Sequence, residues 1–372
     1  MRPPVSVVQR RRAAALQRSS SDGRTYGRGV DEVGLDARVV GGPLLVAEIA
    51  KLFDLGRVKG WRDLGGSRST NLLVATATRG SFVARVHRRS TSWNRLCGEQ
   101  AARRVLAVAG VPTVVPLADR TGATVQHLGC GHLVELERYV PSTATMNTPE
   151  LMRLGFTQLA RVHDVLRSAE LPGEAQQARW ANHIGAGEAA EATRRGAERI
   201  RQWADRDLGW FADAVTLHID EVARAEQEYQ GDRLVQIVHG DFWDNNVLIR
   251  EDRVAAVLDF GFMAEHARVD DLALPFWFHL LEPGRHLPTS DDVDLLRDLV
   301  RTYDQAAEVP LSAAERASLP LAIGRQPAWS IGGWILRLGE ADAVRHAHEA
   351  AAELPVALSV MRHLEAWQHA LR

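Results

Sequence analysis

The segment from His239 to Ala273 constrains the fold and the chemistry of this chain more than any other part of it. Asp241 precedes Asn246 by five residues, and Asp259 follows Asn246 after a further thirteen. Two apolar runs between Asn246 and Asp259 predict a strand hairpin, which would bring these two residues together. The runs and their turn are residues 247–249, 254–258 and 251–253. Because amide and carboxylate oxygens suit Mg²⁺, the segment predicts a base-like carboxylate facing a metal site.

These residues resemble the catalytic segment of the aminoglycoside phosphotransferase family, kinase-fold enzymes that phosphorylate hydroxyls of small molecules. The family pattern H-G-D-x-x-x-x-N matches at residues 239–246, and the D-F and D-L-A elements match at residues 259–260 and 271–273. A protein kinase would usually carry Arg in place of Gly240 and an Ala-Pro-Glu element downstream, which this sequence lacks. The resemblance extends from about residue 50 to the C-terminus and weakens in the substrate-binding helices.

The resemblance implies an α+β, bilobal protein-kinase-like fold. Its N-lobe would be an antiparallel sheet with one long helix, over residues 44–138, and its C-lobe would be mainly α-helical, over residues 139–372. Residues 1–43 hold more arginines than acids and show little apolar periodicity, so they are predicted to be a disordered basic tail. A transit peptide is the alternative for this segment.

Composition and net charge limit the kinds of partner that this protein is expected to bind. A formal net charge of -2 gives no basic field for nucleic acid. The apolar runs are far shorter than the roughly 20 residues that cross a bilayer, so no membrane partner is expected. Cys97 and Cys130 are too few for a disulfide framework, which favours a reducing compartment and a cytoplasmic location. The sequence does not predict the oligomeric state.

The N-lobe is expected to contain one helix before the sheet, one long helix within it, and about five strands. Strand-like runs of residues, bounded by Gly, Ser or Pro, predict the strands of this sheet. The helices are predicted at residues 43–55 and 92–110, and the strands at residues 58–64, 72–78, 81–87, 111–117, 124–127 and 132–140.

The loop 65–71, with Gly66 and Ser67, is predicted to lay backbone N–H groups over the phosphates of ATP. A plain hairpin turn is the alternative. Arg85 stands where the kinase fold usually places its third-strand lysine. Arginine keeps that positive charge and adds a planar fork that suits phosphate oxygens.

The resemblance assigns three further residues to nucleotide binding. Glu99, on the long helix, would pair with Arg85. The backbone of Glu137 and Tyr139, in the stretch that resembles the family hinge, would hold the adenine edge. A surface charge or an edge strand is the alternative in each case.

The C-lobe is expected to be built from helices. Residues 151–167 show apolar residues at helical spacing, and His163 within them is predicted to be a packing residue and not a ligand. Residues 188–229 are strongly charged with a helical period and predict a helical hairpin. Apolar and charged blocks of helix length then alternate to residue 372.

Roles at the reaction centre also follow from the resemblance. Asp241 would accept the proton of the acceptor hydroxyl, and Asn246 and Asp259 would bind Mg²⁺. His239 and Asp271 would support the loop. ATP and Mg²⁺ are the expected cofactors, although the sequence does not separate ATP from GTP.

The acceptor is expected to be a small molecule with a hydroxyl, either an aminoglycoside-type or other antibiotic or a natural-product intermediate. Residues 263–372 hold more acids than arginines, which suits a cationic acceptor. Candidate contacts with the acceptor are Trp243, Asp244, Glu265 and Asp270. The alternatives are a kinase that acts on Ser or Thr of a peptide, and a pseudokinase that binds nucleotide without transferring phosphate.

Overall fold

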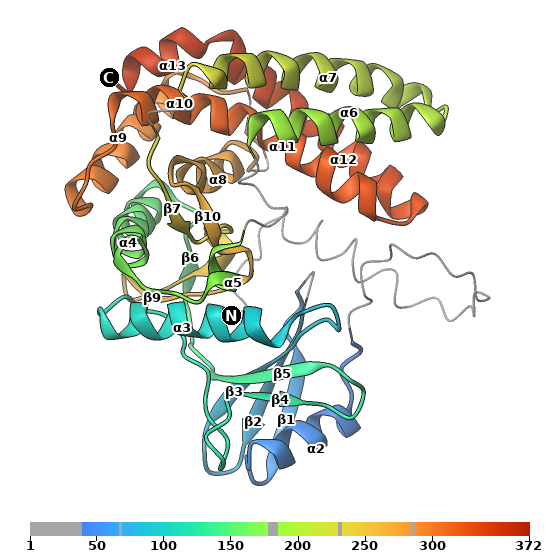
Figure 1. Ribbon diagram of the computed structural model, residues 1–372, viewed down its shortest axis with the longest axis vertical. Coiled ribbons are helices and arrows are strands. Elements are labelled where there is room, and N and C mark those ends of the chain that lie inside the picture. Colours follow the sequence, from blue (N-terminus) through green and yellow to red (C-terminus); the bar gives the residue numbers. More distant parts are fainter. Residues whose placement is uncertain (1–38, 67–68, 178–184, 230–232, 283, 286) are drawn as a thin grey trace.

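The structure is a computed structural model that describes residues 39–372, except for residues 67–68, 178–184, 230–232, 283 and 286. These residues form two lobes, with the catalytic segment in the C-lobe beside the N-lobe helix α3 (Figure 1). The predicted basic tail falls almost wholly outside the described residues. In the part of the chain that the structure describes, no helix is long and apolar enough to cross a membrane.

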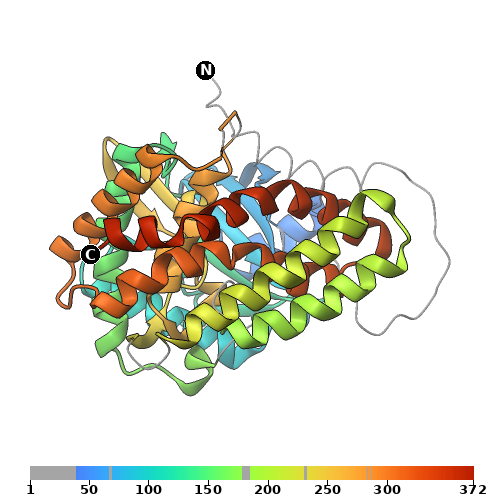
Figure 2. The same ribbon diagram turned by 90° about the horizontal axis from the view of Figure 1, so that it is seen from above.

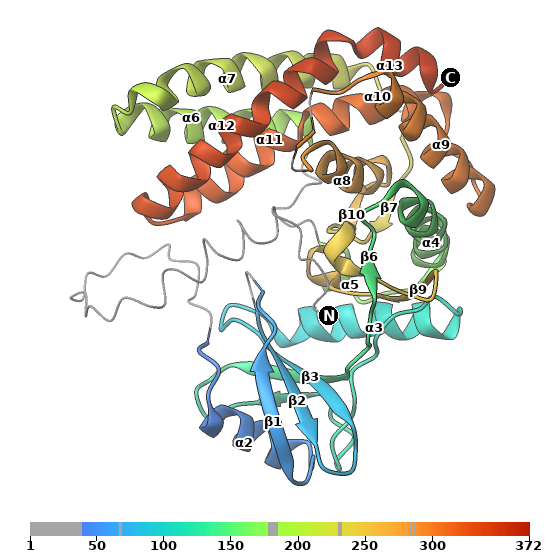
Figure 3. The same ribbon diagram turned by 180° about the vertical axis from the view of Figure 1, so that it is seen from behind.

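The N-lobe is a five-stranded antiparallel sheet in the order β1-β2-β3-β5-β4, which confirms the predicted sheet. Apolar side chains of the sheet pack against α2. Figure 3 shows α2 beside the sheet from behind, and α3 runs between the sheet and the C-lobe (Figure 1). The elements are α2 Pro43–Leu52, β1 Val58–Asp63, β2 Thr70–Thr76, β3 Ser81–Val86, α3 Trp93–Val108, β4 Val125–His127 and β5 Leu133–Arg138.

Strict alternation along β3 decides which side chains reach the active site. Phe82, Ala84 and Val86 are buried in the cluster that α2 covers. Successive side chains of a strand point to opposite faces, so Arg85 lies on the other face. The sheet therefore directs Arg85 toward the C-lobe while its neighbours form the N-lobe core.

The stretch 111–117 was expected to be a strand, and this expectation is wrong. Only Thr113 makes a bridge, with Val257 of the C-lobe. Pro112 and Pro116 have no backbone N–H and cannot donate to a ladder. The stretch connects the lobes instead, because the carbonyl of Pro112 accepts from Val257 N at 2.8 Å.

Helix α3 has clear start and stop signals. The hydroxyl of Ser92 accepts from Arg95 N at 3.1 Å and caps the first turn. Gly110, with φ of +79°, follows the last turn in the left-handed region. Both ends therefore agree with the predicted helix, and they fix which residues of α3 face the C-lobe.

Helices make up most of the C-lobe, and the charged segment 188–229 forms the predicted hairpin of α6 and α7 (Figures 1 and 2). The apolar faces of α6 and α7 pack against each other and against α12. The helices are α4 Pro149–Ser168, α5 Gly173–Gln176, α6 Ala186–Gln202, α7 Arg206–Gln227, α8 Val269–Leu280, α9 Ser290–Ala306, α10 Ala313–Gly324, α11 Gln326–Trp329, the π-helix η5 Ser330–Ile335, α12 Glu340–Arg362 and α13 Leu364–Ala370.

Two small sheets in the C-lobe carry the catalytic segment. Strands β8 (Val247–Arg250) and β9 (Arg253–Val257) form the predicted hairpin, and β6 (Ala144–Thr145) joins β8. Glu251 and Asp252 have φ of 54° and 55°, which matches a two-residue turn with positive φ at both positions. Strand β7 (Val235–Val238) pairs with β10 (Ala264–Ala267) and leads directly into the catalytic loop.

Candidate active site

Asp241 lies on the loop between β7 and β8, and Asn246 holds its side chain in place. The Nδ2 atom of Asn246 donates to the Asp241 backbone oxygen at 2.8 Å and to Oδ2 of Asp241 at 2.9 Å. Asn246 closes the short 3₁₀ turn Asp244–Asn246 (η3) and is 9% exposed. Because the amide nitrogen is occupied by Asp241, the amide oxygen is the group that remains for a cation.

His239 supports this loop from within the core. It is fully buried, and its Nε2 lies 2.9 Å from the carbonyl oxygen of Leu258, so Nε2 carries the hydrogen. Its Nδ1 then accepts from the backbone N–H of Asp241 at 3.2 Å. The ring packs on Phe260 with a centroid distance of 4.5 Å. His239 thus joins the loop that carries Asp241 to the end of β9, a geometry that fits the predicted supporting role.

Asp271, at the start of α8, fixes the backbone of the same loop. Its side chain is fully buried and accepts from the N–H of His239 at 2.7 Å and from the N–H of Gly240 at 2.9 Å. Nε2 of His163 lies 3.1 Å from the same carboxylate, and Nδ1 of His163 lies 2.8 Å from the hydroxyl of Tyr303. His163 is therefore a structural residue that holds Asp271, and not a ligand.

Gly240 adopts a conformation that other residues tolerate poorly. Its φ is +83°, and a Cβ at this position would lie 2.2 Å from the carbonyl oxygen of Phe262. The close approach of these two backbones packs the catalytic loop directly against the turn that follows Asp259. An arginine, as in protein kinases, would not fit this backbone.

We expect Gly240→Ala to lower the free energy of unfolding by about 3–4 kcal/mol, because left-handed strain and overpacking add. Gly110→Ala is the matched control, since Gly110 has φ of +79° and nothing within 4 Å of the added Cβ. That control should cost only about 1 kcal/mol. Urea unfolding measures both, and equal losses would contradict the role of the Phe262 contact.

Asp259 follows β9 with φ of 62° and ψ of 69°, in the left-handed region. Its Oδ1 accepts from Nη1 of Arg85 at 2.8 Å, so the pair joins the two lobes. Burial would raise the pKa of the Asp259 carboxyl, but Arg85 outweighs burial and holds the pKa below its usual value. The backbone N–H of Leu258 donates to the backbone carbonyl oxygen of Asn246 at 2.8 Å, which keeps Asp259 beside Asn246 as predicted from the hairpin.

The predicted pair of Arg85 with Glu99 does not form, and this expectation is wrong. Oε1 of Glu99 accepts from Nε of Arg95 at 2.8 Å, one helical turn earlier on α3, while Arg85 binds Asp259. Arg95 and Arg103 both lie four residues from Glu99, but Arg103 binds Glu135 and Glu137, so Arg95 is the partner of Glu99. Burial raises the pKa of Glu99 above its usual value, although Arg95 opposes the effect.

The acidic side chains near Arg85 lie on β5 and not on α3. Glu135 lies directly opposite Arg85 across the β3–β5 ladder. Arg103 of α3 donates to Glu135 at 2.6 Å and also to Glu137. The side chain of Glu137 is therefore held against α3. Neither Arg95 nor Arg103 was singled out from the sequence, because only the packing of α3 shows that these arginines are buried.

The hinge prediction fails at Tyr139. Its backbone N–H donates to the carbonyl oxygen of Ser81 at 3.1 Å and so extends the sheet. Backbone groups of an antiparallel strand alternate in direction, and Glu137 is paired with Val83 in the same register. The backbone groups of Glu137 and Tyr139 are thus directed to β3, and the alternation turns those of Arg138 the other way.

Of the predicted nucleotide loop, Ser67 lies outside the described residues. Gly66 has φ of +124°, and a Cβ there would lie 2.6 Å from the Ser69 oxygen. Nδ2 of Asn71 donates to the carbonyl of Gly65 at 3.0 Å and closes the turn. These contacts require glycine at position 66, and they leave its predicted contact with phosphate a prediction.

Three of the four candidate acceptor contacts are half-buried or exposed, and the fourth, Asp270, is buried. Trp243 is half-buried and packs on Phe278 of α8, with ring centroids 4.4 Å apart, and Asp244 follows it in η3. Glu265 is exposed on β10. The predicted contact of Asp270 with the acceptor is incorrect. Its Oδ1 lies 2.7 Å from Nη2 of Arg325, and the side chain is buried in the C-lobe.

The buried ion cluster around Arg325 explains this error. Arg325 also donates to Glu226 of α7, so one guanidinium joins α7 and α8. Asp270 is next to Asp271 in sequence but faces a different side of α8, since neighbouring helical residues point about 100° apart. Asp270 therefore stabilises helix packing.

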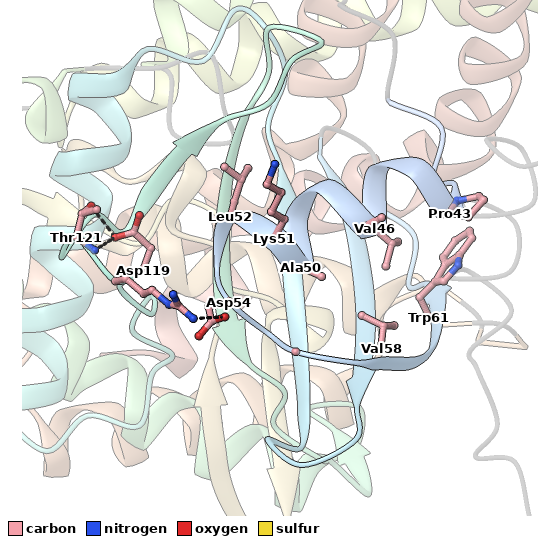
Figure 4. A pocket seen from close by; sticks show the side chains of 13 residues that line it. Pro43, Val46, Ala50, Lys51, Leu52, Asp54, Val58, Trp61, Asp119 and Thr121 are labelled. Atoms are coloured by element: carbon pink, nitrogen blue, oxygen red, sulfur yellow. Dashed lines mark hydrogen bonds and ion pairs between the residues drawn. The ribbon is translucent and has the colours of Figure 1, made fainter.

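A cavity of about 830 Å³ lies on the outer side of the N-lobe and shares no residue with the site described above (Figure 4). Its walls come from α2, β1 and the loop at residues 119–121. Lys51 and Trp61 line it, and Asp54 pairs with Arg120 there at 2.6 Å. The cavity holds no arrangement of base and amide like that at Asp241.

Comparison with other proteins identifies related enzymes. Residues 61–317, well over half of the chain, match the Phosphotransferase enzyme family. A homoserine kinase of Caulobacter sp. (strain K31) is 27% identical over 272 residues, which cover 72% of this chain and 78% of the relative. A homoserine kinase of Phenylobacterium zucineum (strain HLK1) is 26% identical over 284 residues, covering 74% of this chain and 80% of the relative.

Solved structures share the fold. An amicoumacin kinase in complex with AMP-PNP and Ca²⁺ matches with a TM-score of 0.61 at 14% identity, over 84% of this chain and 94% of that chain. A microcompartment-associated aminopropanol kinase matches with a TM-score of 0.61 at 18% identity, over 88% of this chain and 99% of that chain. The kinase-like fold is confirmed. The chain belongs to the Phosphotransferase enzyme family and is a small-molecule phosphotransferase that acts on hydroxyl groups.

Proposed function

We propose that this enzyme transfers the γ-phosphate of Mg-ATP to the hydroxyl of a small molecule that carries an amino group. The observation that carries the proposal is the pair Asp241 and Asn246. The carboxylate of Asp241 is held at 2.9 Å by an amide whose oxygen is left for a cation, beside Asp259. Phosphoryl transfer needs a positioned hydroxyl and neutralised phosphate charge more than covalent chemistry, and this arrangement offers both.

Asp241 would act as the base. It would accept a hydrogen bond from the acceptor hydroxyl and take its proton as the phosphorus–oxygen bond forms. Asp271 and His239 would keep Asp241 in register by holding the loop backbone. The base therefore needs no reorganisation when the acceptor arrives.

The oxygen groups at Asn246 and Asp259 fit Mg²⁺. Arg85 occupies one carboxylate oxygen of Asp259, which leaves the other for a cation. Among the described residues, no group of three or more His, Cys, Asp and Glu side chains could hold a metal ion. Mg²⁺ is commonly bound by one or two carboxylates, water and substrate phosphates, so a two-residue site agrees with its chemistry. When bound, Mg²⁺ neutralises charge on the β- and γ-phosphates.

We expect Arg85→Met to weaken AMP-PNP binding at least about tenfold, because a charge-assisted hydrogen bond to phosphate contributes roughly 1.5–3 kcal/mol. Arg62→Met, on the exposed face of β1, is the matched control and should leave the affinity within about twofold. Isothermal titration calorimetry measures both. Equal affinity of Arg85→Met and wild type would show that another group holds the phosphates.

The acids and aromatic rings near Asp241 favour a small amine as the acceptor. Because Asp270 binds Arg325, the acids that remain among the predicted acceptor contacts are Asp244 and Glu265. The half-buried rings of Trp243 and Phe278, followed by Asp244, suit a single ammonium group, which aromatic faces and carboxylates both attract. Homoserine and aminopropanol, named for the relatives above, each combine one amine with one hydroxyl. We therefore favour a hydroxy amino acid or amino alcohol over an aminoglycoside.

Mass spectrometry of candidate acceptors after incubation with enzyme and Mg-ATP tests this proposal. The panel should contain homoserine, 1-amino-2-propanol, ethanolamine, several aminoglycosides and a Ser/Thr peptide. We expect a mass increase of one phosphate on a small amine, which is absent with Asp241→Asn. Modification of aminoglycosides alone would overturn the choice of acceptor, and modification of the peptide alone would overturn the small-molecule class.

A further inference from the structure

One arginine of the N-lobe, Arg95 on α3, binds the backbone of the segment that follows Asp259. Arg95 is 1% exposed. Its Nη2 donates to the carbonyl oxygen of Met263 and lies 3.4 Å from that of Gly261. Both carbonyls lie in or next to the short turn Phe260–Phe262 (η4), for which Asp259 is the first flanking residue. A side chain from one lobe thus binds the metal-site loop of the other.

The remaining donors of Arg95 are also occupied. Nη1 donates to the carbonyl oxygens of Glu174 at 2.8 Å and Ala175 at 3.2 Å, both in α5, and Nε binds Glu99. A guanidinium has five N–H donors in a fixed planar fork, so it can bind the backbone of α5, the backbone at η4 and the Glu99 side chain at once. A lysine ammonium lacks this geometry.

Two arginines therefore act on the same short segment in different ways. Arg85 binds the side chain of Asp259, whereas Arg95 binds the backbone that follows it. Asp259 has a left-handed backbone that costs free energy unless its surroundings hold it. Gly261 and Met263, whose carbonyls Arg95 binds, lie two and four residues after Asp259. These hydrogen bonds therefore restrict the backbone that directs the Asp259 carboxylate.

We infer that Arg95 is a positioning residue of the metal site: its hydrogen bonds to the Gly261 and Met263 carbonyls fix the backbone that aims Asp259 at the cation. This inference rests on the proposed function, because it takes Asp259 as a metal ligand. Residues that orient metal ligands typically contribute 10–100-fold to metal affinity. The effect should therefore appear in metal binding itself, before any turnover.

A merely structural alternative is that Arg95 attaches α3 to α5. The chain offers a separate test of that contact, because the Glu174 side chain accepts from Ser92 at 3.0 Å and from Asn94 at 2.9 Å. Glu174→Ala removes these bonds and leaves the contact of Arg95 with Met263 intact. It loosens α3 from α5 without releasing the metal-site loop.

The experiment measures Mn²⁺ binding in the presence of AMP-PNP by electron paramagnetic resonance, together with hydrogen exchange of residues 259–263. We expect Arg95→Met to weaken Mn²⁺ binding at least about tenfold and to speed exchange in this segment. Arg104→Met, an exposed arginine of the same helix, and Glu174→Ala should both stay within about twofold of wild type. If Arg95→Met does not fold, Arg95→Lys replaces it. Its Mn²⁺ affinity and exchange rate should lie between those of wild type and the values expected for Arg95→Met.

The outcomes distinguish a failure of the role inferred for Arg95 from a failure of the proposed metal site. Mn²⁺ affinity and loop exchange within twofold of wild type in the Arg95 variants would overturn the inference. A shift of equal size in Glu174→Ala would also overturn it, because attachment of α3 to α5 would then explain the effect. A wild-type protein that binds AMP-PNP but no Mn²⁺ would overturn the metal site of the proposed function, and the inference with it.

Discussion

Replacement of Asp241 by asparagine is expected to lower kcat about a thousandfold while nucleotide affinity stays within about twofold. General-base catalysis typically contributes 10²–10⁴-fold, and an amide cannot take the hydroxyl proton. The loop should keep its shape, because an asparagine oxygen can still accept the Asn246 hydrogen bond now made to Oδ2. The loss should therefore appear in kcat and not in binding.

Steady-state kinetics with the acceptor found by mass spectrometry, and calorimetric titration with AMP-PNP, measure the two effects. Asp252→Asn is the matched control, since Asp252 lies in the exposed turn between β8 and β9 and asparagine tolerates its φ of 55°. It should retain full activity. If Asp241→Asn kept more than about a tenth of wild-type kcat, another group would be the base.

The second large effect is expected at Asp271. Its carboxylate accepts from the N–H groups of His239 and Gly240, and it faces Nε2 of His163. Asp271→Ala leaves these buried donors without an acceptor, and each unpaired donor costs about 1–3 kcal/mol. We expect the free energy of unfolding to fall by about 4 kcal/mol, and kcat to fall because the Asp241 loop loses its support.

Urea unfolding followed by circular dichroism measures this loss. The matched control is Asp291→Ala, because Asp291 is an exposed aspartate in the first turn of α9, as Asp271 is in the first turn of α8. Both variants lose a favourable charge at a helix start, which contributes about 0.3–1 kcal/mol. A loss in Asp271→Ala no larger than in Asp291→Ala would mean that the loop does not depend on this carboxylate.

Local patterns predicted the architecture well because they act over short stretches. The strand-like runs at residues 72–78 and 81–87 and the two apolar runs around the turn 251–253 predicted their elements, since each depends on backbone geometry that neighbouring residues set. The stretch 111–117 is apolar and was predicted to be a strand, but it contains Pro112 and Pro116. In the fold those prolines cannot donate to a ladder, and the stretch connects the lobes instead.

Charge partners were predicted poorly, because partners far apart in sequence are chosen by tertiary packing. Glu99 was assigned to Arg85 from family spacing, but α3 lies so that Arg95 takes Glu99. Asp270 was assigned to the acceptor, but the rotation of α8 turns it toward Arg325. In both cases the charge of the side chain is evident from the sequence, but the direction in which the side chain points is not.

The sequence by itself determined the reaction class, because Asp241, Asn246 and Asp259 lie on one hairpin and its entry loop, whose geometry is local. Only the tertiary structure decided what holds them. Asp271 reaches the loop from α8, Arg85 reaches Asp259 from the N-lobe sheet, and α3 supplies the cation that binds the following turn. These contacts join residues 31 to 174 positions apart, and no local pattern specifies such pairs, since the packing of whole helices and strands brings them together.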